Sequence, residues 1–167
     1  METKIAELAR RMIACSTGNL HDIDHFLKVY AYARTIGVRE GLGETDQTAL
    51  EAAALLHDIA CPLCREKYGN TNGKHQEREG MVLAEEFLRD SGLSREAQDR
   101  VVYLVGHHHT PQEVDGPDYQ ILLEADYLVN ADEGRCSPEN IRSTRDKIFR
   151  TKTGIVLLDA IYLGGGE

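Results

Sequence analysis

Residues Ala52–Cys61 read AAALLHDIAC, an apolar stretch of small residues that ends on an adjacent histidine and aspartate. Burying an ionisable pair such as His57 and Asp58 against an apolar helix costs free energy unless another group pairs with it. Imidazole nitrogens and carboxylate oxygens are suitable donors for a divalent cation, which also needs donors from other parts of the chain. The stretch therefore predicts a metal site whose remaining ligands lie elsewhere in the sequence.

Length and composition are those of an ordinary globular protein. The 167 residues suffice for one well-buried core, so we expect a single domain over residues 1–167. No apolar run approaches the roughly 20 residues of a membrane span. Residues 1–14 mix charged and apolar side chains, unlike a secretory signal. We therefore expect a cytoplasmic protein outside the membrane, with its four cysteines reduced.

The charge balance narrows the choice of partners. Asp and Glu number 28 against 19 Lys and Arg, which gives a formal net charge of −9. This charge opposes attraction to a polyanion, so a nucleic-acid polymer is not an expected partner. An anionic small molecule stays compatible with the sequence, provided that a metal or local cations reverse the charge at its site.

Hydrophobic periodicity predicts the fold class. Apolar residues recur with a spacing near 3.6 along almost the whole chain, which indicates an all-α, compact bundle of about seven to eight helices. Short Gly, Pro, Asn and Asp clusters separate the helices. We expect the motif-bearing core at about residues 20–132 and the C-terminal helices at 138–163. The expected helices cover about residues 2–15, 22–36, 46–59, 75–90, 95–109, 118–131, 138–150 and 155–163, with loops at 61–72 and 110–117.

Three of these helices place polar residues on apolar faces. His25 shares a face with Val29, the His57–Asp58 pair ends its helix, and Asp126 lies beside Leu122. A single inward histidine is more often a hydrogen-bonded core residue than a ligand. Three helices that bury such groups without an evident cationic partner instead favour one shared ion.

The stretches HDIDHFLKV (21–29), AAALLHDIA (52–60) and LLEADYLV (122–129) resemble the HD-domain metal-dependent phosphohydrolase superfamily. The resemblance implies an all-helical bundle in which His25, His57, Asp58 and Asp126 coordinate a divalent metal. The metal would be Mn, Fe, Mg, Ni, Co or Zn, as one ion or two. The implied reaction is hydrolysis of a phosphomonoester or phosphodiester, often of a nucleotide, by metal-activated water. Asp58 is also expected to orient or deprotonate that water.

Members of the superfamily with two metals add histidines between the His–Asp pair and the last aspartate. The candidates for a second metal or a phosphate contact are His75 and the triplet His107, His108 and His109. His108 is the best candidate because it continues the apolar stripe of its expected helix. The triplet has an alternative interpretation as a solvated helix end, where imidazolium is favoured by the helix dipole.

Several further interpretations stay open. Lys28 and Lys74 are candidate contacts for a substrate phosphate. The CxxC at Cys61 and Cys64 lacks the second pair that a structural zinc site needs. The expected partner is a small phosphorylated substrate, and the apolar segment 155–163 leaves room for a homodimer. The alternatives to a phosphohydrolase are a di-iron oxygenase of the same fold and a non-catalytic metal- or nucleotide-binding module.

Overall fold

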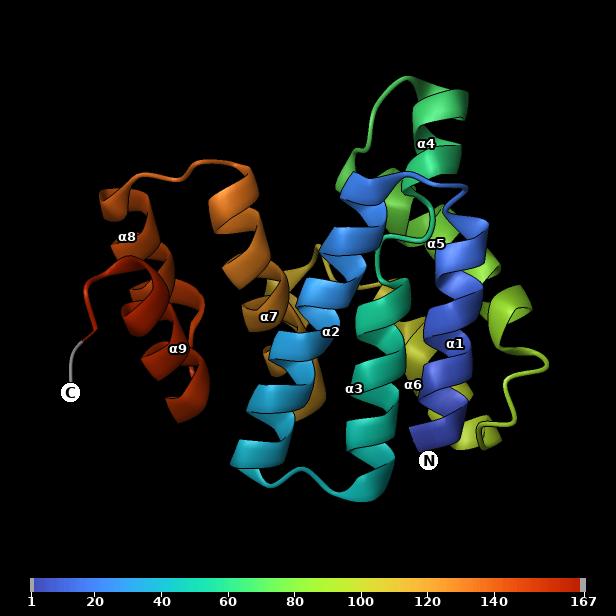
Figure 1. Cartoon of the computed structure of the whole chain (residues 1–167), viewed down its shortest axis with the longest axis horizontal. Coiled ribbons are helices and arrows are strands. Elements are labelled where there is room, and N and C mark those ends of the chain that lie inside the picture. The colour runs from blue at the N-terminus through green and yellow to red at the C-terminus, as the bar shows by residue number, and fades with distance from the viewer. Residues whose placement is uncertain (1, 166–167) are drawn as a thin grey trace.

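The computed structural model describes residues 2–165, and all regular structure in this part of the chain is helical (Figure 1). This confirms the all-α prediction. The described residues form nine α-helices and one 3-10 turn, Pro111–Glu113. The helices are α1 (Glu2–Cys15), α2 (Leu20–Glu40), α3 (Glu44–Leu56), α4 (Cys61–Tyr68), α5 (Gly73–Leu88), α6 (Arg95–Val105), α7 (Pro117–Glu133), α8 (Pro138–Ile148) and α9 (Lys152–Tyr162).

Helix α3 is the centre of the fold. Every residue of α3 from 47 to 56 is buried, and the helix packs against α1, α2, α6 and α7. Its alanines, among them Ala49 and residues 52–54, let neighbouring helices approach closely on several sides, so that apolar surface leaves water all round the helix. The C-terminal end of α3, where the His–Asp pair follows, is therefore held in the interior.

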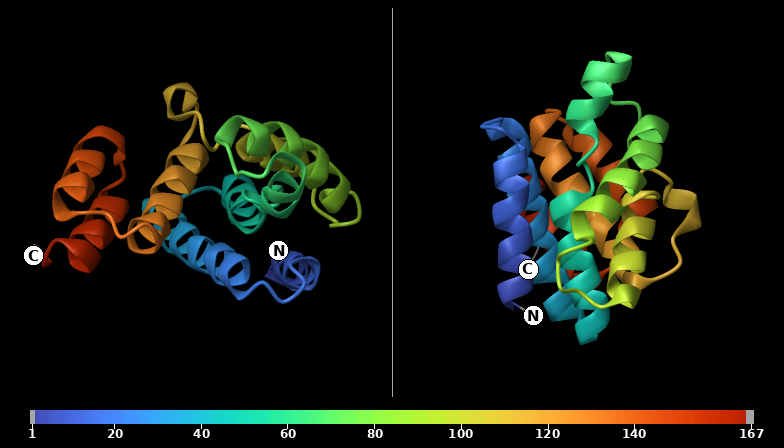
Figure 2. Two further views of the ribbon diagram at one scale, coloured as in Figure 1. Left: turned by 90° about the horizontal axis from the view of Figure 1, so that it is seen from above. Right: turned by 90° about the vertical axis from the view of Figure 1, so that its right-hand side faces the viewer.

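Helices α8 and α9 lie side by side at one end of the molecule, beyond α7 and far from α5 and α6 (Figures 1 and 2). Glu124 on α7 is fully buried and accepts hydrogen bonds from the backbone N–H groups of Arg150 (2.7 Å) and Thr151 (3.0 Å). The Thr151 hydroxyl also donates to Glu124. A Cβ atom at Gly154 would lie 2.0 Å from Glu124 Oε2, so any larger residue there would displace the Glu124 carboxylate. Glu124 thereby fastens the α8–α9 connection to α7.

A second contact fastens the start of α9. Glu40, the last residue of α2, accepts a hydrogen bond from the backbone N–H of Thr153 at 2.8 Å. The first N–H groups of a helix have no partner within the helix, so this carboxylate satisfies a donor that would otherwise face solvent. Glu124 and Glu40 thus connect the start of α9 to α7 and to α2, respectively.

The prediction of a loop over residues 61–72 is wrong for its first part, because Cys61–Tyr68 forms α4. Pro62 lies in the first turn of this helix, where a missing N–H costs nothing, and Gly69 ends the helix with a φ of 68°. Proline and glycine were interpreted as loop residues, whereas here they mark the two ends of a short helix.

Most other helix boundaries differ from the predicted ones by a few residues, and two of these differences affect the histidines. Helix α3 ends at Leu56, so the His–Asp pair begins a turn before α4. Helix α6 ends at Val105, so the histidine triplet lies in the turn after the helix and not in its last turn. Ser94 and Ser137 cap the N-termini of α6 and α8 through their side chains.

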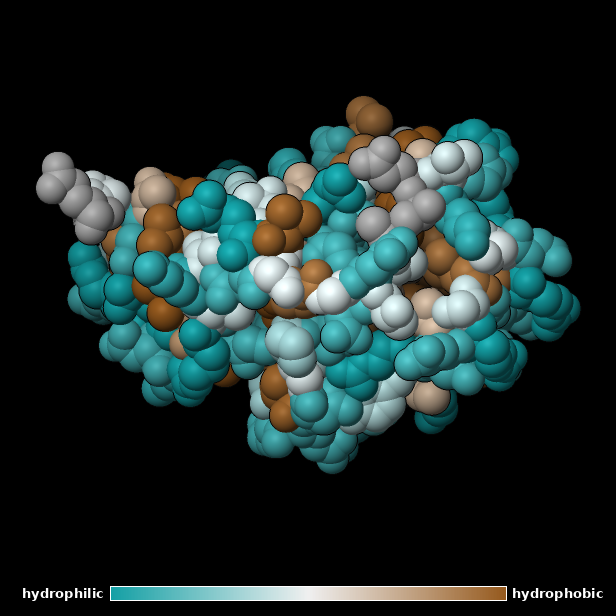
Figure 3. Space-filling model, turned by 90° about the horizontal axis from the view of Figure 1, so that it is seen from below, coloured by the Kyte–Doolittle hydropathy of each residue, from teal (hydrophilic) through white to brown (hydrophobic). Residues whose placement is uncertain are grey.

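None of the described helices is long and apolar enough to cross a membrane. The face drawn in Figure 3 is mostly hydrophilic, and its apolar residues lie in small separate groups.

Candidate metal centre

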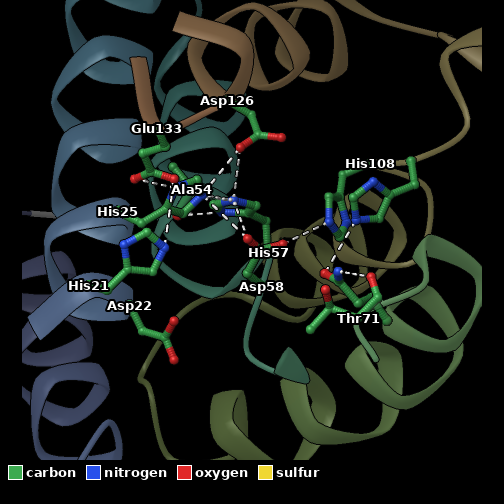
Figure 4. A network of polar contacts seen from close by, with 12 residues as sticks. His21, Asp22, His25, Ala54, His57, Asp58, Thr71, His108, Asp126 and Glu133 are labelled. Carbon is green, nitrogen blue, oxygen red and sulfur yellow. Dashed lines mark hydrogen bonds and ion pairs between the residues drawn. The ribbon is translucent and has the colours of Figure 1, made fainter. Parts of the chain in front are cut away.

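Four side chains from α2, the turn after α3, and α7 converge at the C-terminal end of α3 (Figure 4). The Nε2 atoms of His25 and His57 are 3.1 Å apart. Asp126 Oδ1 lies 3.3 Å from both nitrogens, and Asp58 Oδ2 lies 3.3 Å and 3.5 Å from them. Ligands at about 2.1 Å from one ion are separated by about 3.0 Å at right angles and about 3.4 Å in a tetrahedron. Four of these five separations fall in this range, and the fifth, 3.5 Å between His57 and Asp58, lies just above it.

Hydrogen bonds on the far side of each imidazole fix its orientation. His57 Nδ1 donates to the carbonyl oxygen of Ala54 at 2.9 Å, so its Nε2 carries the lone pair when the ring is neutral. Glu133 lies on the other side of His25, with its carboxylate oxygens 3.0 and 3.1 Å from Nδ1. A carboxylate in this position is a common support for a metal-ligating histidine, because it keeps the proton on the far nitrogen.

The donors fit a cation. Two neutral imidazoles would direct lone pairs at each other across 3.1 Å, beside two carboxylates, so positive charge has to lie between them. Asp126 Oδ1 is also buried and has no hydrogen-bond partner within residues 2–165, which is costly for a carboxylate unless an ion satisfies it. A divalent cation would supply the positive charge and also bind Asp126 Oδ1.

The pKa shifts of His25 and Asp126 also indicate that the cluster needs positive charge. Burial would lower the pKa of His25, but the carboxylates of Asp126 and Asp58 outweigh burial and raise the pKa to about 11. Burial would raise the pKa of Asp126, yet the facing imidazoles hold it well below its usual range. The two carboxylates therefore favour positive charge between them, which imidazolium protons or a cation can supply.

His108 extends the cluster from the other side of Asp58. Its Nδ1 donates to the carbonyl oxygen of Val105 at 2.7 Å, and its Nε2 lies 3.2 Å from Asp58 Oδ1. Asp58 thus faces the His25–His57 pair through one oxygen and His108 through the other. Asp58, His108 and His109 each place one donor atom within 4.8 Å of the others, which makes a second candidate donor set.

Two of the other predicted histidines, His75 and His107, lie outside the metal-binding cluster. His75 stacks on Tyr68 with ring centroids 4.0 Å apart, and His107 stacks on Tyr103 at the same distance. Neither belongs to the donor sets within the described residues. Sequence periodicity had grouped the triplet as one helix end. The turn after α6 instead leaves His107 against Tyr103, while the rings of His108 and His109 lie together with centroids 3.9 Å apart.

A cavity of about 250 Å³ opens beside the four converging side chains. Predicted phosphate contacts Lys28 and Lys74 are exposed and do not line it, whereas Arg65 on α4 does. The residues that line the cavity are His21, Asp22, His25, Phe26, Asp58, Cys61, Arg65, Thr71, Gln76, His109, Asp126, Asn130 and Glu133.

Sequence analysis missed Glu133 and Arg65. Asp126, Asn130 and Glu133 are spaced i, i+4 and i+7 on α7, so helical periodicity from Asp126 was a sufficient signal for Glu133. Arg65 could be placed only after residues 61–68 were known to form a helix, and no pattern in the sequence indicated that helix.

Fold and site together define an all-helical protein with a largely buried His/Asp cluster that could hold a metal ion. The model of the HD domain family matches residues 22–133, a range that includes all four converging residues. The chain therefore belongs to the HD-domain metal-dependent phosphohydrolase superfamily, as the sequence predicted. No curated protein and no solved structure is significantly similar to the chain.

Proposed function

We propose that this protein is a metal-dependent phosphohydrolase that cleaves a phosphomonoester or phosphodiester of a small molecule, with a nucleotide or related metabolite as the substrate. The observation that carries the proposal is the cluster in which His25, His57 and Asp58 place donor atoms within 4.8 Å of one another. Asp126 Oδ1 lies 3.3 Å from both imidazole nitrogens of this cluster. These four residues would hold one divalent ion, of the group Mn, Fe, Mg, Ni, Co or Zn. Membership of the HD domain family supports this chemistry.

A divalent ion in this site supplies a Lewis acid for the phosphate and an activated water for attack. The protein's own groups do the rest. Glu133 keeps the Nδ1 proton of His25 in place, and the Ala54 carbonyl does the same for His57. Asp58 is the acid–base candidate, because its Oδ1 faces His108 and its carboxylate lines the cavity where the water would lie.

The cavity supports a small substrate. Typical ligand sites measure about 300–1,000 Å³, and this cavity of about 250 Å³ is smaller. It has room for a phosphate group and the atoms next to it, while the remainder of a nucleotide would extend out of the opening.

Release of inorganic phosphate tests the proposal. Protein loaded with Mn²⁺ is incubated with nucleoside phosphates, sugar phosphates and cyclic phosphodiesters. We expect turnover of at least one ester by the wild type, a loss of at least about 100-fold in Asp58→Ala, and no loss in the control Asp90→Ala, an exposed aspartate on another face. Absence of phosphate release with every metal of the group would contradict the proposal.

Two alternatives make different predictions. The second donor set of Asp58, His108 and His109 favours a di-iron oxygenase as the first alternative. Iron-loaded protein would then consume oxygen in the presence of a substrate and release no phosphate. A non-catalytic module would bind metal or nucleotide without turnover, and Asp58→Ala would change only the affinity.

A homodimer and a cytoplasmic location belong to the same proposal. Helix α9 exposes Val156 and Ile161, whose exposed fractions are 54% and 42%, and these residues are the support for a dimer contact. The four cysteines are free, which supports a reducing compartment. Light scattering of Val156→Lys against the wild type tests the dimer, and fractionation of the source cells tests the location.

A further inference from the structure

The cavity carries an excess of negative charge. Among its lining residues Asp22, Asp58, Asp126 and Glu133 are acidic, and Arg65 is the one lysine or arginine in the described part of the chain that lines it. Such a cavity repels a phosphate ester unless cations offset the carboxylates. A bound metal would offset Asp58 and Asp126, which leaves Arg65 as the protein's own cation for an incoming anion.

Asp22 holds Arg65 in position. Arg65 Nη2 donates to Asp22 Oδ2 at 2.5 Å, and the side chains are 43% and 11% exposed, respectively. Among the described residues the guanidinium makes no other hydrogen bond, so its remaining N–H groups are available to a ligand. A guanidinium presents its donors in a planar fork that suits the oxygens of a phosphate. Arg65 is therefore held in position by Asp22 and keeps N–H donors for a ligand.

Neighbouring cations in the sequence do not share this environment. Lys67, two residues further along α4, forms an ion pair with Glu79 at 2.8 Å. Arg78 on α5 donates to the Tyr68 hydroxyl at 2.7 Å. Neither residue lines the cavity.

We propose that Arg65, held by Asp22 at the cavity wall, binds the phosphate group of the substrate. The proposal rests on the proposed function for the identity of the anion as a phosphate ester. It also adds to that function, because it assigns the anion contact to α4 and not to Lys28 or Lys74. The substrate class that fits this arrangement is a small ester whose phosphate reaches both the His/Asp cluster and the guanidinium.

Inorganic phosphate is the probe for this site. Isothermal titration of phosphate into wild type, Arg65→Ala, Arg65→Lys and Lys67→Ala compares the four proteins at equal metal content, set by elemental analysis. We expect Arg65→Ala to bind phosphate at least about tenfold more weakly, since it loses charge-assisted hydrogen bonds. Arg65→Lys keeps the charge but loses the fork, so its affinity should lie in between. Lys67→Ala should match the wild type.

The possible outcomes distinguish phosphate binding by Arg65 from the proposed phosphohydrolase activity. Equal phosphate affinity in Arg65→Ala and wild type, or no phosphate binding by the wild type, would show that Arg65 only ties α4 to α2. Thermal melting of Arg65→Ala, Arg65→Lys and Lys67→Ala checks that all three variants are folded. Phosphate binding that depends on Arg65, without release of phosphate from any ester, would overturn the hydrolase and leave the anion site in place.

Discussion

Glu133 Oε2 lies 3.0 Å from Nδ1 of His25, although 108 residues separate the two side chains in the sequence. The carboxylate acts on the metal centre only through this imidazole. Because it holds the Nδ1 proton, it directs the Nε2 lone pair of His25 towards His57 and Asp126. Loss of the carboxylate should therefore weaken metal binding without removing a ligand.

We expect Glu133→Ala to reduce the affinity for Mn²⁺ by about 10- to 100-fold. Glu133→Gln keeps an oxygen acceptor for Nδ1–H but not the charge, so it should recover part of the affinity. Isothermal titration with Mn²⁺ measures both, and Glu139→Ala, an exposed position on α8, is the control. Wild-type affinity in Glu133→Ala would exclude a positioning role.

Substitutions on the two sides of Asp58 should separate the first ion from any second one. Asp126→Ala removes an oxygen that is 3.3 Å from both imidazoles, so we expect loss of the bound ion. His108→Ala removes only the group facing the other oxygen of Asp58, so the first ion should remain. Metal-to-protein ratios from elemental analysis report both results. Loss of all metal in His108→Ala would contradict this division.

Glu124 should be among the most costly residues to truncate. Its buried carboxylate accepts from Gln120 (2.8 Å), from two backbone N–H groups and from the Thr151 hydroxyl, and Glu124→Ala leaves these donors unpaired. We expect a loss of about 3 kcal/mol in the free energy of unfolding. In a chain of this size that loss lowers Tm by about 6–12 °C. Calorimetry of Glu124→Ala against Glu139→Ala measures the difference, and equal melting of the two would contradict the assignment.

Glu40 should make stability depend on pH. Hydrogen bonds from the side chain and the backbone N–H of Thr153 lower the pKa of Glu40 below its ordinary value of 4.5. A lowered pKa means that the stabilisation is fully present above pH 4.5 and is lost as the pH falls through the folded-state pKa. Glu40 is exposed, so we expect only about 0.5 kcal/mol at pH 7.

Thermal melting of wild type and Glu40→Gln tests this expectation. The gap between the two melting temperatures should narrow as the pH falls from about 5 to about 3.5. A gap that stays constant over this range would contradict the expectation, because protonation of Glu40 would then leave the stability of the wild type unchanged.

Sequence periodicity predicted most of the helices and brought His25, His57 and Asp126 to inward faces. It succeeded because those helices have an apolar stripe, and a polar residue on the stripe must meet the groups of neighbouring helices. His75 and His107 show the limit of prediction from periodicity, because both rings stack on tyrosines near helix ends. At those positions the local turn decides the direction of a side chain, and a periodic pattern carries no information about it.

Helix α4 shows a different reason for failure. It has eight residues, and only Cys61 and Cys64 are buried in it. Two buried positions give no detectable hydrophobic period. Sequence reasoning therefore could not place Arg65 on α4 at the cavity. Glu133 was also missed, but its position two turns after Asp126 on α7 was enough to find it.

The burial of α3 on all sides has a consequence for hydrogen exchange. Backbone amides from 47 to 56 lie where exchange requires global unfolding, and His57 directly follows them. The short α4, which packs on α5, has few buried contacts and should exchange through local opening at lower free energy. The two walls of one cavity thus belong to cooperative units of unequal stability, with the His/Asp cluster fixed on one side and Arg65 on the side that opens first.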